Sequence, residues 1–435
     1  MHQSKLYCFL ILFFPLFGSA QLAINFNPIP SSFNINSPNP LYALDISYDV
    51  IDVDKQAFHL FLPDSTDVYP LVIYIHGGGF DSGTRDVVLD NENRRADIKY
   101  FLEQGIAYAS IDYRLLPREG AGVDTEGVIK PLNDSKRALQ FIRHHADALH
   151  IEPSKIVLTG GSAGAGTSLW LATRSDMANP EAVDPVLRAS TRVCAAALSA
   201  CQSTYDLYKW ETEVYHDFDG EGTNYTIDSM VNLLSFERYS NFYGGLDSNY
   251  QLIHDPFLIQ YREDVDMLFH MAEDDPPIYI SSQSGAIHPG QDLFHHPFHG
   301  REIQAQALAA GLPEVKAVIP RLDIDSTEGE SINAFLERHL ATCSLTTDVE
   351  TVEPERLNNI RVYPNPADER IFVKASSGVI EEIRIYSPAG NLLLAKQQIK
   401  APYTIVDTTV LPKGIYLLSV IASNGKKQVR RIAIQ

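Results

Sequence analysis

The chain has 435 residues, a formal charge of −20 and 45 % hydrophobic residues. This composition excludes an acidic disordered tail, a disulfide-dense miniprotein and a protein that binds nucleic acid through bulk positive charge. The length predicts two or three domains. Residues 357–435 carry eleven Lys and Arg against five Asp and Glu, which leaves a charge of −26 on the rest of the chain. This asymmetry predicts a separate C-terminal module.

The first 20 residues have the pattern of a secretory signal peptide. Lys5 precedes an apolar run over residues 6–17, and the small residues 18–20 follow it. The run is shorter than the roughly 20 apolar residues that a membrane-spanning helix needs. We therefore expect a secreted or cell-surface protein with no transmembrane segment in the mature chain.

Three cysteines remain once Cys8 has left with the signal peptide, namely Cys194, Cys201 and Cys343. An odd number in an oxidising compartment is compatible with one disulfide and one free thiol, and the spacing does not choose the pair. None of the three has the Cys/His spacing of a zinc site. We therefore interpret all of them as structural.

Residues 46–62 alternate between apolar and polar around a turn at 52–55, which predicts an antiparallel hairpin. After it, short apolar runs alternate with helical stretches. The predicted strands are residues 71–77, 106–115, 155–161, 193–200, 277–282 and 315–322, and the predicted helices are 95–104, 131–148, 164–175, 301–310 and 330–339. This order predicts an α/β fold for residues 21–342, with a doubly wound, mainly parallel sheet that binds ligands at the carboxyl ends of its strands.

Residues 202–266 are rich in Tyr, Asp, Asn and Gly and show no clear periodicity. Irregular loops are the simpler interpretation of this segment, and a cap or lid over the sheet is the alternative. Its tyrosines and Trp210 either pack or line a binding pocket, and we favour packing.

Two glycine-rich motifs follow predicted strands. GGSAG at residues 160–164 lies between a strand and a helix, where small residues allow a tight turn that exposes the Ser162 hydroxyl. HGGG at residues 76–79 follows another strand, and the N–H groups of bare glycines can approach a substrate oxygen. With DYRL at 112–115 and the helix at 133–146, these motifs resemble the esterase and lipase branch of the α/β-hydrolase superfamily over residues 42–340.

This resemblance implies a role for each motif residue. Ser162 would be the nucleophile, and the backbone N–H groups of Gly78, Gly79 and Ala163 would form the oxyanion hole. His76 would be structural and would orient its loop. The implied reaction is cleavage of a carboxylic ester through an acyl-serine intermediate, on a small-molecule, glycan or lipid ester.

The general base and its acid are not in the positions that the resemblance implies. Residues 284–286, after the seventh strand, contain no carboxylate, and residues 300–338 contain no histidine. The loop before residue 300 instead offers Asp292 and four histidines, which are His288, His295, His296 and His299. Among these we favour His296 as the base, with Asp292 or Asp206 as the orienting acid. The alternative is that the base is lost and the fold serves as a non-catalytic binding protein.

The sequence does not favour a metal or a cofactor. His295 and His299 are four residues apart, but Pro297 disfavours a regular helix between them. The acidic segment at 323–330 lacks the positions of an EF-hand loop. There is no phosphate-binding loop or dinucleotide fingerprint either, so we expect no cofactor and no nucleic-acid partner.

The C-terminal region begins with a polar, acidic stretch at residues 343–356, which we interpret as a linker. Short strands with turns at 387–390 and 424–425 then predict a small β-sandwich over residues 357–435. The segments YPNPADERI, IYSPAGNLL and LPKGIYLLSV resemble the type A C-terminal sorting domain of the bacterial type IX secretion system. That resemblance implies the type IX secretion machinery as a partner, export across the outer membrane and removal of the tail.

Overall fold

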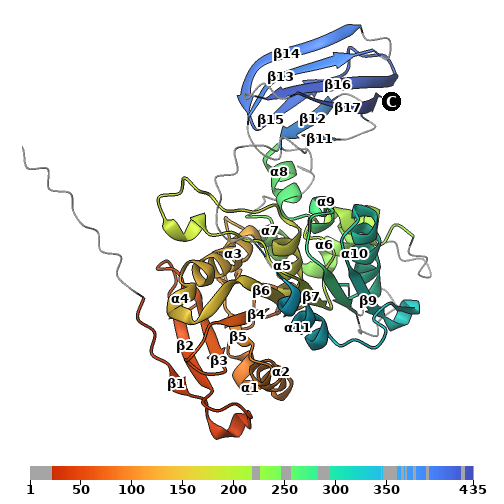
Figure 1. Cartoon of the computed structure of the whole chain (residues 1–435). Coiled ribbons are helices and arrows are strands. Elements are labelled where there is room, and N and C mark those ends of the chain that lie inside the picture. Colours follow the sequence, from red (N-terminus) through yellow and green to blue (C-terminus); the bar gives the residue numbers. More distant parts are fainter. Residues whose placement is uncertain are drawn as a thin grey trace, which may run out of the picture. The chain divides into compact units, whose positions relative to one another are not determined.

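The computed structural model describes residues 22–217, 226–245, 256–282, 293–343 and 345, and residues 360–434 apart from 364–366, 368–369, 376–378, 388–390 and 423–426. The predicted signal peptide, His288, Asp292 and most of the predicted linker lie outside these residues. The chain divides into two compact units, residues 1–349 and 350–435 (Figure 1).

A ten-stranded sheet forms the centre of the first unit, in the order β1-β2-β3-β5-β4-β6-β7-β8-β9-β10. The strands from β5 to β9 in this order pair in parallel, and β1, β2, β3 and β10 add antiparallel pairs at the two ends. The predicted hairpin is formed by β2 and β3, with Ile46 opposite Phe58. The strands are β1 (Asn27–Pro28), β2 (Leu41–Ser47), β3 (Ala57–Leu62), β4 (Tyr69–Ile75), β5 (Ala107–Ile111), β6 (Ile151–Gly161), β7 (Ala196–Ser199), β8 (Ile278–Ser281), β9 (Val315–Ile319) and β10 (Ile324–Asp325).

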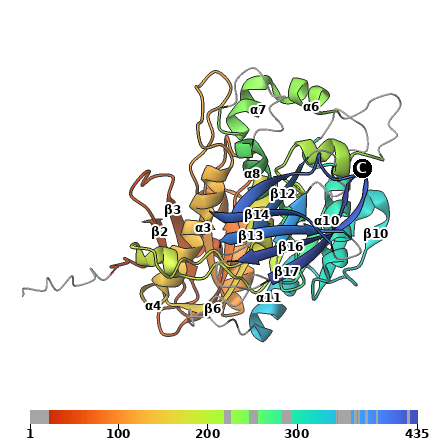
Figure 2. The ribbon, with the colours of Figure 1, turned by 90° about the horizontal axis from the view of Figure 1, so that it is seen from above.

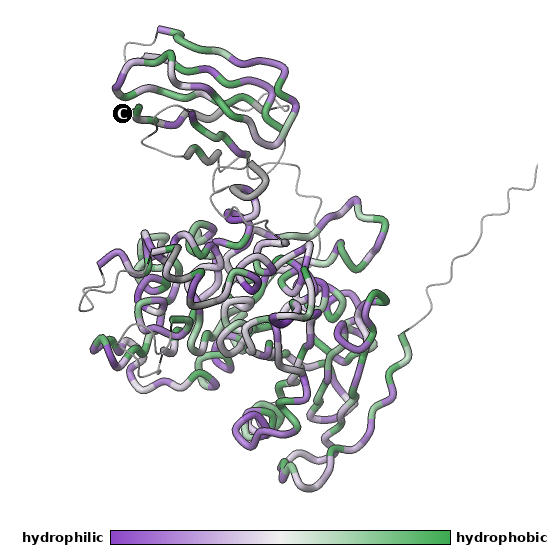
Figure 3. Tube along the Cα trace, turned by 180° about the vertical axis from the view of Figure 1, so that it is seen from behind, coloured by the Kyte–Doolittle hydropathy of each residue, from purple (hydrophilic) through white to green (hydrophobic). Residues whose placement is uncertain are grey.

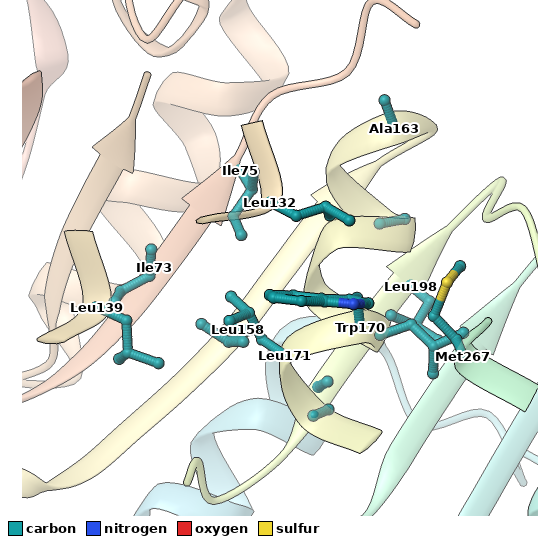
Figure 4. Close-up of a cluster of buried hydrophobic side chains, with 14 of the residues drawn as sticks. Ile73, Ile75, Leu132, Leu139, Leu158, Ala163, Trp170, Leu171, Leu198 and Met267 are labelled. Carbon is teal, nitrogen blue, oxygen red and sulfur yellow. The ribbon is translucent and has the colours of Figure 1, made fainter. Parts of the chain in front are cut away.

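Helices cover both faces of this sheet, which explains why its central strands are apolar on both sides. On β4, Val72 and Tyr74 join one buried cluster with α2 and α11, while Ile73 and Ile75 join another with α3, α5 and α10. Figure 4 shows part of the second cluster, where Trp170 of α5 lies beside Leu158 of β6. The prediction of a doubly wound, mainly parallel sheet is confirmed. The helices here are α1 (Val87–Asp90), α2 (Glu92–Glu103), α3 (Ile129–His144), α4 (Ala146–Leu149), α5 (Ala163–Thr173), α9 (Met267–His270), α10 (Pro297–Ala310) and α11 (Ile332–Thr342).

The interpretation of residues 202–266 as irregular loops is wrong. The described parts contain a π-helical turn at Trp210–Val214 and the helices α6 (Ile227–Leu234), α7 (Phe236–Phe242) and α8 (Pro256–Asp264). Side-chain caps define two of the helix starts: the hydroxyl of Thr226 accepts from the N–H of Ser229, and that of Ser235 from the N–H of Arg238. Each α-helix has only seven to nine residues, too few to show a clear apolar period in the sequence.

One disulfide joins Cys194, which lies just before β7, to Cys343 at the end of α11. It links residues 149 positions apart, so it ties the last helix of the first unit to the central sheet. Cys201 is a buried free thiol, and burial raises its pKa. One disulfide and one free thiol is the arrangement with which the cysteine count is compatible, and the structure identifies the pair that the spacing did not choose.

The second unit consists of two antiparallel sheets, β11-β12-β15 and β14-β13-β16-β17. Figure 2 shows the strands of the second sheet side by side, and in Figure 3 hydropathy alternates along them. Inward residues of both sheets, such as Val373 of one and Ile385 and Leu418 of the other, form one buried cluster, as the predicted β-sandwich requires. The strands are β11 (Ile360–Tyr363), β12 (Arg370–Ala375), β13 (Ile380–Tyr386), β14 (Leu392–Ala401), β15 (Tyr403–Asp407), β16 (Gly414–Ala422) and β17 (Lys427–Ile434).

Of the two predicted turns, at 387–390 and 424–425, all but Ser387 lies outside the described residues. The strand pairs that flank them, β13 with β14 and β16 with β17, are antiparallel. Among the helices of the described residues, none is long and apolar enough to cross a membrane.

Candidate active site

Ser162 occupies the sharp turn between β6 and α5 at the centre of the sheet. Its backbone has φ 53° and ψ −122°, a conformation that L-residues rarely adopt and that commonly marks a functional site. Its N–H donates to the carbonyl of Ser199 on the neighbouring strand over 2.9 Å, which fixes the turn against the sheet. The serine therefore lies at the carboxyl ends of the parallel strands, where such a sheet binds its ligands.

Glycines are required around this serine because backbone from two strands meets there. A Cβ on Gly164 would collide with the carbonyls of Ile75 and His76. A Cβ on Gly77 would lie 2.6 Å from the carbonyl oxygen of Gly161 and 3.2 Å from the Cβ of Ser162. The two glycine motifs of the sequence are thus in direct contact.

His295 is the histidine that reaches the serine. Its Nε2 lies 2.8 Å from the Ser162 Oγ, within hydrogen-bond reach for a proton transfer. The His295 side chain is partly buried and lines the same cavity as Ser162.

The prediction that His296 contacts the serine is wrong by one position in the chain. His296 is the N-cap of α10, and its Nδ1 accepts from the N–H of Phe298 at 3.2 Å. Its buried ring packs edge-on against Tyr215, with centroids 5.4 Å apart. Pro297 starts the helix, so consecutive side chains leave the backbone in different directions, and the residue before the cap faces the cavity.

Two carboxylates, Asp292 and Asp206, are the candidates for the orienting acid. Asp292, the favoured candidate, lies outside the described residues. The alternative, Asp206, is not supported, because its two carboxylate oxygens bind Arg262 at 2.7 and 2.9 Å. Burial raises the pKa of Asp206 to about 6, while Arg262 opposes that shift.

His299 forms part of the cavity's supporting structure. Its Nδ1 lies 3.0 Å from the Ser203 hydroxyl, and its Nε2 lies 3.2 Å from the carbonyl of Leu293. Complete burial lowers the pKa of His299 to about 3, so the ring is neutral at physiological pH. Because α10 begins only at Pro297, His295 and His299 do not share a helical face. The described residues contain no group of three or more His, Cys, Asp or Glu side chains that could hold a metal ion.

The HGGG loop at residues 76–79, which the resemblance predicts to be the oxyanion loop, is shaped by hydrogen bonds to the Gly78 carbonyl. The Ser82 hydroxyl and N–H donate to it at 2.8 and 3.1 Å. Because a trans peptide directs its N–H opposite to its carbonyl, the Gly79 N–H points away from Ser82. Similarly, the Ser162 carbonyl accepts from Gly166 inside α5, which leaves the Ala163 N–H at the open, positive end of that helix.

His76 lies in the buried support of this loop, in agreement with the structural role that the resemblance implies. Its Nε2 lies 2.7 Å from the carboxylate of Asp112, and its ring stacks on Tyr113 at 4.3 Å. Asp112 is itself held by Arg85 at 2.9 Å and Lys55 at 3.4 Å. A buried charge network therefore fixes the oxyanion loop from behind.

A cavity of about 380 Å³ opens over Ser162 and His295. Six of the described lining residues are Phe, Tyr or Trp. Among them, Tyr205, Trp210 and Tyr239 of residues 202–266 line the cavity as well as pack, whereas Tyr208 and Tyr243 of the same segment lie in the buried core. The lining residues are Gly78, Gly79, Phe80, Ser162, Ala163, Gln202, Tyr205, Leu207, Trp210, Arg238, Tyr239, Phe242, Phe294 and His295. The cavity has the size and apolar character of a small-molecule site.

Two family models match the chain. Residues 58–233 match BD-FAE, and residues 361–435 match the secretion system C-terminal sorting domain. The first unit is thus similar to an α/β-hydrolase esterase family, and the second matches a secretion sorting domain. The sorting domain marks the protein as secreted or cell-surface, as its sequence indicates.

Relatives of the esterase domain include carboxylesterases. The chain is 31 % identical over 147 residues to carboxylesterase NlhH of Mycobacterium tuberculosis, which covers 33 % of this chain and 42 % of that protein. It is 27 % identical over 134 residues to non-reducing polyketide synthase atr1 of Stereocaulon alpinum, which covers 29 % of this chain and 5 % of that protein. The chain thus spans less than half the length of these curated relatives. A solved truncated carbohydrate esterase from gut microbiota has 15 % identity and a TM-score of 0.47, over 69 % of this chain and 96 % of that chain.

Proposed function

We propose that the protein is a secreted serine hydrolase that cleaves carboxylic esters through an acyl-serine intermediate. The observation that carries the proposal is the 2.8 Å separation between His295 Nε2 and Ser162 Oγ at the mouth of an oxyanion loop. A serine hydroxyl is a poor nucleophile until a base takes its proton, and this contact supplies the base.

Each step follows from the geometry around Ser162. Neutral His295 accepts the hydroxyl proton at Nε2 as the Ser162 oxygen attacks the ester carbonyl carbon. The N–H groups of Gly78, Gly79 and Ala163 donate to the developing oxyanion, and one such donor typically contributes about 10²- to 10³-fold in rate. His295 then gives the proton to the leaving alcohol oxygen, which breaks the ester bond and leaves an acyl-serine.

Hydrolysis of the acyl-serine uses the same groups, with water in place of the Ser162 hydroxyl as the nucleophile. His295 takes a proton from water, the water oxygen attacks the acyl carbon, and the proton returns to the Ser162 oxygen as the carboxylic acid leaves. For Nε2 to accept a proton, Nδ1 must carry the ring hydrogen. We assign Asp292 as the acid that holds this tautomer, since it precedes His295 by three residues in the sequence.

The aromatic cavity favours an ester with an apolar part, and the sorting domain places that substrate outside the cell. Small-molecule, glycan and lipid esters all satisfy these two conditions. The competing interpretation, a binding protein that has lost its base, rested on the absence of histidine from residues 300–338. The contact of His295 with Ser162 favours the hydrolase.

The test is hydrolysis of 4-nitrophenyl acetate and butyrate by the purified protein and by Ser162→Ala. We expect turnover of at least one ester, with a loss of about 10³-fold or more in the variant. Equal rates for the two proteins would show that any hydrolysis comes from other surface groups and would overturn the proposal. Tight binding of esters without turnover would favour the binding protein.

A further inference from the structure

Arg238, on α7, lies beside the oxyanion loop although it is 76 residues from Ser162 in the chain. One of its terminal nitrogens is only 2.6 Å from the position that a Cβ on Gly79 would occupy. Its side chain lines the cavity and remains 40 % exposed. A cation therefore stands at the open end of the site, in a protein whose formal charge is −20.

The short helix that carries Arg238 is held in place by its neighbours. The Glu237 carboxylate accepts from the N–H of Gly120 at 2.9 Å. The Asn241 side chain accepts from the N–H of Asp124 at 2.9 Å and donates to the carbonyl of Gly122 at 3.0 Å. These bonds fix α7 against the loop before α3, so the backbone that carries Arg238 is held beside the cavity.

Among the described residues, the Asp81 carboxylate and the Phe294 ring contact this guanidinium. A terminal nitrogen lies 3.1 Å from the Asp81 carboxylate, and the group lies 5.5 Å from the Phe294 ring centroid. A guanidinium has five N–H donors in a planar fork that matches a carboxylate. One contact with Asp81 leaves donors for a second carboxylate.

The walls of the cavity separate an apolar region from this charged region. Trp210 and Tyr239 are each 1 % exposed, and Tyr205 and Phe80 are each 2 % exposed. These buried aromatic walls suit the apolar part of a ligand, whereas Arg238 at the exposed end suits an anion.

We propose that Arg238 is a specificity-determining residue that selects esters carrying a carboxylate. The substrate would join an apolar group, held between the aromatic walls, to an acidic group that pairs with the guanidinium. Asp81 competes with the substrate carboxylate for Arg238 and so limits this selection. The inference rests on the proposed function, because the selected ligand is the ester that Ser162 attacks.

The experiment compares matched esters that differ by one carboxylate. The pair 4-carboxyphenyl butyrate and phenyl butyrate puts the charge on the alcohol, and the pair 4-nitrophenyl hydrogen glutarate and 4-nitrophenyl butyrate puts it on the acyl group. The quantity measured is the ratio of kcat/KM for the charged ester to that for its neutral partner. In at least one pair, Arg238→Gln should lower this ratio by roughly tenfold or more. A fall in the first pair would place the acidic group on the alcohol part of the substrate, and a fall in the second pair would place it on the acyl part.

Two further variants separate recognition from a structural role. Asp81→Asn removes the competing carboxylate, so the ratio should rise. Arg118→Gln is the matched control, since Arg118 is exposed, its side chain donates to the Asp81 backbone carbonyl at 3.1 Å, and it is not among the described residues that line the cavity. This control should leave the ratio within about twofold of wild type. If the Arg238–Asp81 pair had only a structural role, Arg238→Gln would instead lower kcat/KM equally for both esters of a pair.

Binding in the Ser162→Ala background distinguishes this inference from the proposed function. Calorimetry with the same ester pairs gives a ratio of dissociation constants that requires no turnover. Stronger binding of a charged ester that disappears in Ser162→Ala/Arg238→Gln would support the inference even if the wild type were inactive. The inference would be overturned if Arg238→Gln left both the ratio of kcat/KM values and the ratio of dissociation constants unchanged in both ester pairs.

Discussion

The adjacent residues His295 and His296 allow a matched pair of substitutions, because the structure gives them separate tasks. His295→Asn removes the base that lies 2.8 Å from the Ser162 Oγ. Loss of one member of such a triad typically lowers kcat by about 10⁴-fold or more, equivalent to about 5 kcal/mol of transition-state stabilisation. The half-buried side chain contributes little to packing, so the free energy of unfolding should change by less than about 1 kcal/mol.

His296→Asn should lower the stability of the protein and leave most of its activity. Asparagine is a good N-cap and can still accept from the Phe298 N–H, but the buried ring that packs on Tyr215 is lost. We expect the free energy of unfolding to fall by roughly 1–2 kcal/mol and kcat/KM to stay within about tenfold of wild type. The assays are 4-nitrophenyl butyrate hydrolysis, well below the melting temperature, and urea unfolding. Equal losses of activity in the two variants, with both proteins folded, would refute the assignment of His295.

Three further predictions concern the support of the site and the fold. Asp112→Ala should lower the free energy of unfolding by about 1–3 kcal/mol in urea titrations, since it removes the buried carboxylate that accepts from Arg85 and contacts the His76 ring, while Arg85 keeps its bond to Asp45; a loss below about 0.5 kcal/mol would contradict the buried network. The double variant Cys194→Ser/Cys343→Ser should lose about 2–4 kcal/mol, whereas wild type should show the same loss only under reducing conditions. Acid should destabilise the folded protein through His299, because burial lowers the pKa of this ring to about 3, below the ordinary histidine value of about 6.5. The stability that the neutral ring contributes is complete above about pH 6.5 and is lost as pH falls toward 3, at up to about 1.4 kcal/mol per pH unit. His299→Gln should reduce the slope of unfolding free energy against pH in that window, and an unchanged slope would refute this origin.

Local patterns in the sequence predict most of the first unit. The strand that contains Leu158 and the helix that contains Trp170 are long, apolar and separated by a glycine-rich turn, so their types and order could be predicted. The position of Ser162 between them follows from the same turn. These features depend on residues that are neighbours in the chain.

The features that the sequence did not predict depend on contacts between distant segments. His295 and His296 are adjacent and chemically identical, and only the start of α10 at Pro297 determines which of them faces Ser162. Arg238 reaches the oxyanion loop because α7 is bound to a loop more than 100 residues earlier, a relation that no local pattern shows. The short helices of residues 202–266 were missed for a related reason, since packing and caps rather than periodicity stabilise them.

The most direct test of the central claim is covalent trapping of the nucleophile. The purified protein is incubated with a 4-nitrophenyl alkylphosphonate, and the site of modification is located by peptide mass spectrometry. We predict one phosphonyl group on Ser162, much slower labelling of His295→Asn and none of Ser162→Ala. Labelling at another residue, or no labelling of a folded wild-type protein, would contradict the assignment of Ser162 as the nucleophile.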